Sequence, residues 1–287
     1  MAATLLKTAA GRELGVVEHG LVARLEAAGV ALIVAIGAAV IFVPLLLTLY
    51  LSVFNEKLIL FPPHGYTLSW YPAIIPNFGG AIVTSFELAL AAVAGSLVIG
   101  VPAGIALSRG NFRGRAIVST LLLAPLTVPL IALGLAIYVL LVLIDQHFGS
   151  ALTGSLAGLI AAHLLITTPW AVRLSLAALA NHDRAAEEAA ASLGAHPLAV
   201  IWRVTLPAMR PGIIAAGLFC FIISFGNFEL ALFLTSPGVT TLPVALFEYL
   251  EYHIDPLVSA VAVAQMIVIG AVLLVLDRFV RLGQVVR

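Results

Sequence analysis

The sequence has little charge and almost no cysteine. Charged residues make up 10% of its 287 positions, and 14 Lys and Arg balance 14 Asp and Glu. The single cysteine, Cys220, lies inside an apolar run, which excludes a disulfide within the chain and a cysteine metal cluster. We expect no nucleic acid among the partners of this protein.

Motifs that carry enzyme chemistry are also missing. The sequence contains neither a G-x-x-x-x-G-K-[ST] loop, which would cradle the phosphates of ATP, nor a G-x-S-x-G nucleophile. None of the seven histidines belongs to an H-x-x-x-H pair or a similar ligand set. We therefore expect no catalytic residue, no metal and no cofactor in this chain, and we do not expect it to be an enzyme.

Long apolar runs dominate what is present. Mean hydropathy is +1.15, and six segments reach the length of about 20 apolar residues that crosses roughly 30 Å of hydrocarbon. They are residues 27–54, 81–107, 116–144, 153–172, 212–234 and 257–276. These runs do not alternate between apolar and polar residues, so helices fit and an outer-membrane barrel does not. The sequence predicts an all-α polytopic membrane protein with six transmembrane helices.

The basic residues predict the orientation of these helices. Lys and Arg are enriched in the cytoplasmic loops of membrane proteins. With the N-terminus inside, every Lys and Arg except Lys57 falls on the cytoplasmic side. We expect both termini in the cytoplasm, a cytoplasmic lead over residues 1–26 and one membrane domain over residues 27–287. No cleaved signal peptide is evident, so the first span is expected to act as an uncleaved signal.

Two of the outside loops are long. Residues 55–80 contain prolines and aromatics, which indicate an ordered interfacial segment with Trp70 at headgroup depth. Residues 235–256 are expected to form a small cap over the outer mouth. Within the third span, Pro125 and Pro129 are expected to mark kinks that pack the bundle, since prolines in spans more often do this than form sites.

A polar connection over residues 183–207 stands out between the fourth and fifth spans. Asp183 is suited to cap a helix, and Glu187 and Glu188 fall in its first turns, where carboxylates favour the helix dipole. Gly194 can end this helix in a left-handed conformation. We therefore predict a short helix on the cytoplasmic face, placed between two spans.

A second short helix is expected to follow. Pro197 suits its first turn, and Leu206-Pro207 is expected to stop it, because the residue before a proline is pushed out of the helical region. One interpretation of the whole connection is an amphipathic interfacial linker. The other is a docking element for a cytoplasmic partner, which the run of alanines from Ala189 favours because small side chains let another surface approach the backbone.

The same stretch resembles a known motif. It is similar to the EAA motif of binding-protein-dependent ABC importer permeases. Glu188-Ala189-Ala190 is followed after three residues by Gly194, after nine more by Val204, and after one more by Leu206-Pro207. Residues 108–115 resemble the short basic turn of that family. Residues 61–71 and 224–244 resemble its spermidine/putrescine-type subgroup.

The resemblance implies a working assembly in a bacterial inner membrane. It comprises a second permease subunit, in this subgroup a different chain, two ATPase subunits that bind ATP and Mg, an extracytoplasmic solute-binding protein and membrane lipid. The segment around the motif would be the coupling helix that sits in a groove of the ATPase. The residues expected to couple are Glu187, Glu188, Ala189, Ala190, Gly194, Leu206 and Pro207.

Polar residues near the outer end of the fifth span are candidates for the solute pathway: Ser224, Asn227 and Glu229. If the fifth helix is regular, Glu229 lies about 26 Å along it, near the outer interface. It either receives a cationic solute there or only reaches headgroup water. Asn227 would lie about 200° from Glu229 around such a helix, so only one of them can face the pathway. Polyamine-type relatives often carry an acidic residue where this chain has Gly226.

The resemblance points to an importer of polyamines or related cationic, amine-bearing solutes. Acidic residues in the outer loops suit a cationic solute, but they also suit a basic patch on a docking protein. Aminoalkylphosphonates, opine-like compounds and ferric iron are alternative solutes for the same machinery. From other classes, an ATP-independent secondary transporter would show internal repeats and midplane acidic relays, and an intramembrane enzyme would show paired catalytic residues. Neither pattern is visible in the sequence.

Overall fold

The computed structural model describes residues 2–57, 61–180 and 182–280. Helices account for the regular structure of these residues. In chain order they are α1 (Ala2–Leu51), α2 (Ile74–Arg109), α3 (Arg115–Leu123), the 3-10 turn η1 (Ala124–Thr127), α4 (Leu130–Phe148), α5 (Leu156–Ala180), α6 (Ala185–Ser192), α7 (Pro197–Val200), the π-helical η2 (Ile201–Thr205), α8 (Leu206–Phe225), the 3-10 turn η3 (Ala231–Phe233), α9 (Leu242–Tyr252) and α10 (Pro256–Val280). Among these residues, six helical segments are long and apolar enough to cross a membrane, which confirms the predicted all-α class and number of spans.

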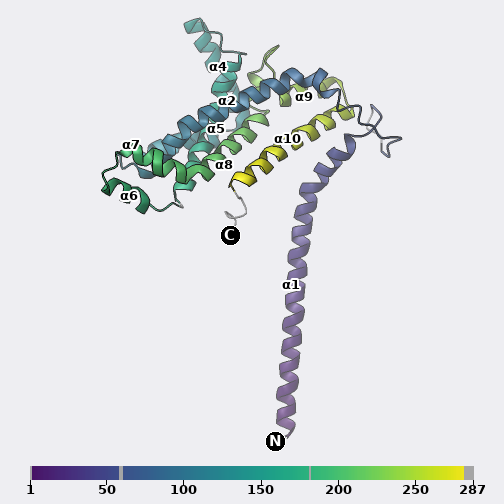
Figure 1. The fold of residues 1–287 in the computed structure, drawn as a ribbon. Helices are drawn as coiled ribbons and strands as arrows, with labels where there is room; N and C mark the ends of the chain where they lie inside the picture. Colours follow the sequence, from purple (N-terminus) through teal and green to yellow (C-terminus); the bar gives the residue numbers. More distant parts are fainter. Residues whose placement is uncertain (1, 58–60, 181, 281–287) are drawn as a thin grey trace.

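Helices α2, α5 and α8 form the packed centre of the molecule, and they lie side by side in Figure 1. Positions along α2 approach successively later positions along α5, so these two helices run in the same direction. Helix α8 packs against both of them and runs the opposite way, since Gly212 near its start lies beside Ala178 and Ser224 near its end contacts His163. Helix α6 therefore lies at the end of the bundle where α2 and α5 finish and where α8 begins.

Small residues bring α2 and α5 close together. A Cβ atom added at Gly100 would lie 2.5 Å from the Cβ of Ala171, and one added at Gly104 would lie 2.5 Å from the Cβ of Ser175. Carbon atoms in ordinary contact are about 3.5–4.0 Å apart. Only glycine therefore fits at these two positions, as is typical of helix pairs in membranes, where close packing replaces the hydrophobic effect.

Helix α1 is peripheral. Its apolar part, Ala27–Leu51, has none of its residues buried. Its main contact is with α10, and in Figure 1 the helix extends away from the rest of the bundle toward the N-terminus. The backbone of residues 2–26, the expected lead, continues the same helix.

The loop after α1 is ordered by contacts with its own ends. The indole N–H of Trp70 donates to the carbonyl of Phe54 over 2.7 Å, and the hydroxyls of Ser52 and Tyr71 lie 2.9 Å apart. Phe54 is fully buried. These contacts agree with the order expected from the aromatics of this loop, of which residues 58–60 lie outside the described part.

Helix α9 forms part of the second long loop, residues 235–256, which was expected to be a small cap over the outer mouth. It packs against α2, with the rings of Phe78 and Tyr249 5.4 Å apart. The hydroxyl of Ser85 in α2 accepts from the backbone N–H of Leu242 at 2.8 Å. Burial and the neighbouring Asp255 raise the pKa of Tyr249 to about 12, so its hydroxyl stays protonated and donates to that carboxylate.

The third span differs from the prediction of one helix over residues 116–144. The structure breaks it into α3, η1 and α4, and only α4 is a candidate span. Pro125 lies in η1 and Pro129 immediately precedes α4. Proline removes a backbone donor and clashes with the preceding turn, which explains the break and confirms the interpretation of these prolines as kinks.

The fifth span was also predicted wrongly. The prediction was a helix over residues 212–234 with a separate short helix stopped by Leu206-Pro207. In the structure one continuous helix of 29 residues runs from Pro197 to Phe225, and Gly226 is its C-cap. The π-helical turn η2 precedes Pro207, and the N–H of Leu206 bonds to the carbonyl of Ile201, five residues earlier. This wider turn accommodates the proline ring, so the helix continues.

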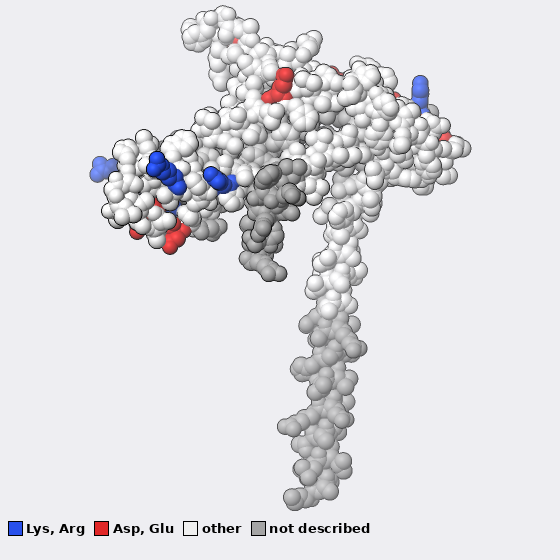
Figure 2. Space-filling view, in the orientation of Figure 1, with Lys and Arg blue, Asp and Glu red and all other residues white. Residues whose placement is uncertain are grey.

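Charged side chains gather at the ends of the molecule. On the face shown in Figure 2, Lys and Arg cluster at the end formed by α6 and α7, and the helix surfaces beyond them are largely uncharged. This distribution is that of a protein whose central surface faces hydrocarbon, because a charge at the bilayer centre costs about 2.5–3.5 kcal/mol on insertion scales.

Candidate functional site

Helix α6 is built by its local sequence. The carboxylate of Asp183 accepts from the N–H of Ala185 at 3.1 Å, and both glutamates lie in the first turns. At the other end Gly194 has a φ of +82°. Its N–H donates to the carbonyl of Ala191, and the next N–H donates to that of Ala190. This is the Schellman arrangement, so the predicted stop at Gly194 is present.

One carboxylate ties α6 to the membrane helices. Oε1 of Glu187 accepts from Nη2 of Arg109 at 3.2 Å and from the hydroxyl of Thr205 at 3.1 Å. Nε of Arg109 lies 3.1 Å from Oε2 of the same carboxylate. Nη2 of Arg184 also donates to the carbonyl of Ser108 at 2.9 Å. Helix α6 is thus attached to the last turn of α2 and to η2.

The rest of α6 is open to its surroundings. Glu188 and Ala189 are exposed, and Leu193, at the end of the helix, is 89% exposed. Small side chains along this helix leave its backbone open to close approach by another surface. Leu206 and Pro207 lie within the long helix formed by α7, η2 and α8 and not on this exposed surface.

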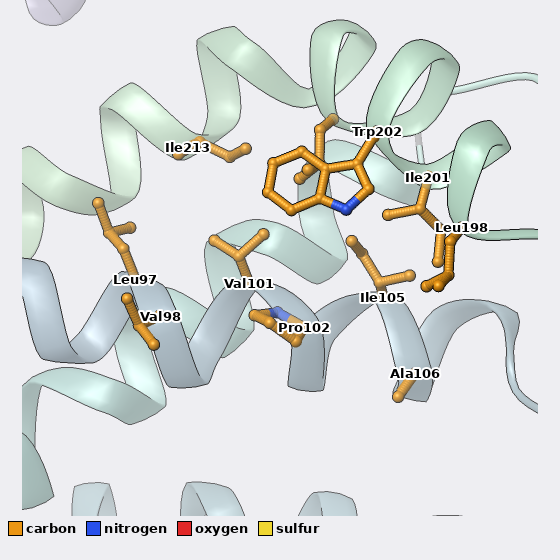
Figure 3. Close-up of a pocket in the computed structure, with 11 residues that line it drawn as sticks. Leu97, Val98, Val101, Pro102, Ile105, Ala106, Leu198, Ile201, Trp202 and Ile213 are labelled. Atoms are coloured by element: carbon orange, nitrogen blue, oxygen red, sulfur yellow. The ribbon is translucent and has the colours of Figure 1, made fainter.

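An apolar groove lies between α2 and the helix formed by α7, η2 and α8. It has a volume of about 700 Å³, and Figure 3 shows the indole of Trp202 lying over it, opposite Val101 and Pro102. It is lined by Leu97, Val98, Val101, Pro102, Ile105, Ala106, Leu198, Ile201, Trp202, Leu206 and Ile213. Because nearly all of this lining is aliphatic, the groove offers nothing to a charged solute.

A buried polar network crosses the centre of the bundle. Nδ1 of His163 in α5 lies 2.8 Å from the hydroxyl of Ser224 in α8. The hydroxyl of Thr167 donates to the carbonyl of His163 at 2.6 Å and lies 2.6 Å from that of Ser96 in α2. Cys220 donates to the carbonyl of Thr167 at 3.3 Å. Buried polar groups need such partners, since an unmade hydrogen bond costs about 1–3 kcal/mol.

Two of the three candidate pathway residues, Asn227 and Glu229, lie beyond the helix that was expected to hold them. Ser224 is 3% exposed and belongs to the network, and Asn227 is 5% exposed and accepts from the N–H of Leu230 at 3.0 Å. Glu229 lies in a turn beyond the end of α8 and is partly buried. The distance of 26 Å along a helix and the angle of 200° between Asn227 and Glu229 are therefore wrong, because α8 ends at Phe225.

Sequence reasoning missed the partners of Glu187 and the role of His163. No local pattern marks Arg109 or Thr205 as a partner of Glu187, although a charged group at the end of a span is a signal of such a contact. His163 was visible as an ionisable residue within a span. Its contact with Ser224, 61 residues away, was not.

Six apolar helices and a polar helix exposed at one end of the bundle define a polytopic membrane protein. Comparison of the sequence with known protein families specifies the family to which this chain belongs. The family described as "Binding-protein-dependent transport system inner membrane component" matches residues 96–282, and the chain belongs to it. This chain is a permease subunit of a binding-protein-dependent ABC importer.

The chain is similar along most of its length to curated permeases. It is 29% identical over 243 residues to the putrescine transport system permease protein PotI of Escherichia coli (strain K12), covering 84% of this chain and 85% of that protein. It is 25% identical to the spermidine/putrescine transport system permease protein PotC of the same strain, covering 78% and 83%. It is 31% identical over 60% of its length to 64% of a putative 2-aminoethylphosphonate permease, PhnU, of Salmonella choleraesuis (strain SC-B67).

Solved structures share the fold. A bacterial ABC transporter involved in the import of alginate superposes with a TM-score of 0.67 at 19% identity, covering 89% of this chain and 96% of that one. The MetNI methionine ABC transporter in an inward-facing conformation gives 0.60 at 19% identity, covering 73% and 97%. At these identities the likeness concerns the fold alone.

Proposed function

We propose that this permease imports a polyamine such as putrescine. The observation that carries this proposal is the similarity to a putrescine permease over 84% of the chain. The acidic side chains Glu248 and Glu251 on α9 and Asp255 beside it suit a cationic solute or its carrier. An aminoalkylphosphonate is the second candidate, because a permease named for 2-aminoethylphosphonate shows 31% identity over part of the chain. Both solutes carry an amine.

The assembly we propose contains this chain, a second and different permease chain, two ATPase subunits and an extracytoplasmic binding protein. ATP would be hydrolysed by the ATPase subunits, since the sequence of this chain lacks a phosphate-binding loop of its own. Both termini and α6 would lie in the cytoplasm. The asymmetry of Lys and Arg supports this orientation.

Helix α6 would be the coupling helix. Its capped ends and exposed small residues suit docking into a groove of the ATPase. Closure of the two ATPase subunits on ATP would move the two coupling helices together and favour the outward-facing state, in which the cavity receives solute from the binding protein. Hydrolysis would then reset the transporter.

Co-purification tests the importer and its partners. The tagged chain is purified in mild detergent, the co-purifying proteins are identified, and ATPase activity is assayed. We expect a nucleotide-binding subunit, lost in the Gly194→Asp variant but retained in a Gly80→Ala control, because a Cβ at Gly80 meets no other atom within 4 Å. If the chain purifies alone and transports putrescine in liposomes without ATP, a secondary transporter replaces this proposal.

Calorimetry on the partner binding protein tests the solute separately. We expect it to bind putrescine and not 2-aminoethylphosphonate. The reverse preference would overturn the polyamine assignment while leaving the importer intact.

A further inference from the structure

The two neighbouring glutamates of α6 have different surroundings. The side chain of Glu187 is 14% exposed and contacts two other elements, whereas Glu188 is exposed. Successive residues of a helix point about 100° apart, so one glutamate faces the bundle and the other faces away from it. The EAA-type motif begins with Glu188, whereas Glu187, the residue before it, contacts α2 and η2.

The carboxylate of Glu187 connects three helical elements at one point. Arg109 is the last residue of α2, and Thr205 is the last residue of η2, directly before α8. Arg109 is 18% exposed and Thr205 is 2% exposed. A charge-assisted contact in such a shielded place is stronger than a surface ion pair. The partners lie 78 and 18 residues from Glu187 along the chain.

The elements that Glu187 joins are parts of the packed centre. Close to Arg109, Gly104 of α2 packs without a gap against Ser175 of α5. Thr205 continues directly into α8, which packs against both α2 and α5. Packed interiors transmit displacement because they are nearly incompressible. A force on α6 therefore reaches all three central helices if the contact at Glu187 is intact.

We propose that Glu187 is a positioning residue that fixes α6 rigidly to α2 and α8, while Glu188 faces the partner that displaces α6. This inference rests on the proposed function, which takes that partner to be the ATPase. Without the Glu187 contact, the hydrogen bond from exposed Arg184 to the carbonyl of Ser108 still ties α6 to α2. This single exposed bond leaves η2 and α8 unconnected to α6, so α6 remains docked on the ATPase while the connections at either end take up most of its movement. ATP is then hydrolysed without equivalent solute import.

The test uses the complete transporter with its binding protein in liposomes and putrescine as the solute. The variants are Glu187→Ala and Arg109→Ala, with Arg113→Ala as a control that removes an exposed positive charge from the neighbouring turn. Two quantities are measured: ATPase subunit recovered per permease, and putrescine imported per ATP hydrolysed. We expect both test variants to keep the ATPase and to lose roughly tenfold in import per ATP, within the range of about 5- to 150-fold typical of coupling between sites. Arg113→Ala leaves both quantities unchanged.

A charge swap separates positioning from general damage. In Arg109→Glu/Glu187→Arg the ion pair is reversed, and we expect import per ATP to recover at least half of the loss seen in either single substitution. If Glu187→Ala does not purify as a folded protein, the swap decides, because failure to recover coupling overturns the inference. It is also overturned if Glu187→Ala imports as much putrescine per ATP as the unaltered protein, or if it loses the ATPase. A failure of the proposed function looks different, since the unaltered chain would then recover no ATPase at all.

Discussion

The contact between α2 and α5 makes a quantitative prediction at Gly104. In a Gly104→Ala variant the new Cβ would lie 2.5 Å from the Cβ of Ser175, while ordinary contact needs about 3.5–4.0 Å. The two helices must therefore separate by about 1 Å. Overpacking of this kind costs about 1–3 kcal/mol, against which alanine gains up to about 1 kcal/mol in helix propensity. We expect a net loss in the free energy of unfolding of about 0–3 kcal/mol.

A matched pair of variants isolates the packing cost. Gly80→Ala lies in the same helix and its Cβ meets nothing within 4 Å, so we expect a gain of up to about 1 kcal/mol from propensity alone. In Gly104→Ala/Ser175→Gly the clashing atom is gone, and the remaining neighbour, the carbonyl of Val172, is 3.4 Å away. The hydroxyl of Ser175 is buried and makes no hydrogen bond within the described residues, so its removal strands no partner.

The assay is unfolding of the purified protein in detergent by titration with a denaturing detergent, followed by tryptophan fluorescence. The coupling energy in the double-mutant cycle is expected to be about 1–3 kcal/mol in favour of the double variant. If Gly104→Ala is as harmless as Gly80→Ala, or if Ser175→Gly gives no rescue, α2 and α5 do not approach each other as described.

Three further predictions concern other parts of the chain. Gly194→Ala should cost about 1–2 kcal/mol in local stability of α6, because alanine is strained in the left-handed conformation, and Gly194→Asn should cost less. Hydrogen exchange of residues 185–195 measures both losses. Equal protection in the unaltered protein and the two variants contradicts the cap at Gly194. Asn227→Ala should lower the free energy of unfolding by about 1 kcal/mol, since it removes the acceptor for the N–H of Leu230, whereas a purely pathway role would change import and leave stability untouched. In a Cys220→Ser background, Arg113→Cys, at an exposed position outside α6, should react with a membrane-impermeant maleimide only in inside-out vesicles. Glu251→Cys should react only in intact spheroplasts, and labelling of both from one side would refute the orientation.

Local features of this protein could be predicted because each depends on neighbours in sequence. The spans follow from run length, the ends of α6 follow from Asp183 and Gly194, and the start of α7 follows from Pro197, because caps act within a few residues. The break in the third span at Pro125 and Pro129 was indicated by the same local chemistry. The exact boundaries of α3 and α4 could not be predicted, because packing decides where each of these helices begins.

The errors arose where a distant or cooperative contact competes with a local rule. Pro207 should have ended a helix, but the π turn before it lets the chain continue. The partner of Ser224 was also hidden: Ser224 stays a candidate for the solute pathway, and the structure adds that it pairs with His163. Such pairings satisfy buried polar groups across helices, and no short window of sequence reveals them.

The sequence by itself determined that this chain is a six-span permease with a capped polar helix between its fourth and fifth spans. Apolar length, basic asymmetry and a spaced motif are one-dimensional properties. Only the tertiary structure decided which of two adjacent glutamates faces the bundle. Its partner Arg109 lies 78 residues away, and the folded core alone brings the ends of α2 and η2 to the same carboxylate.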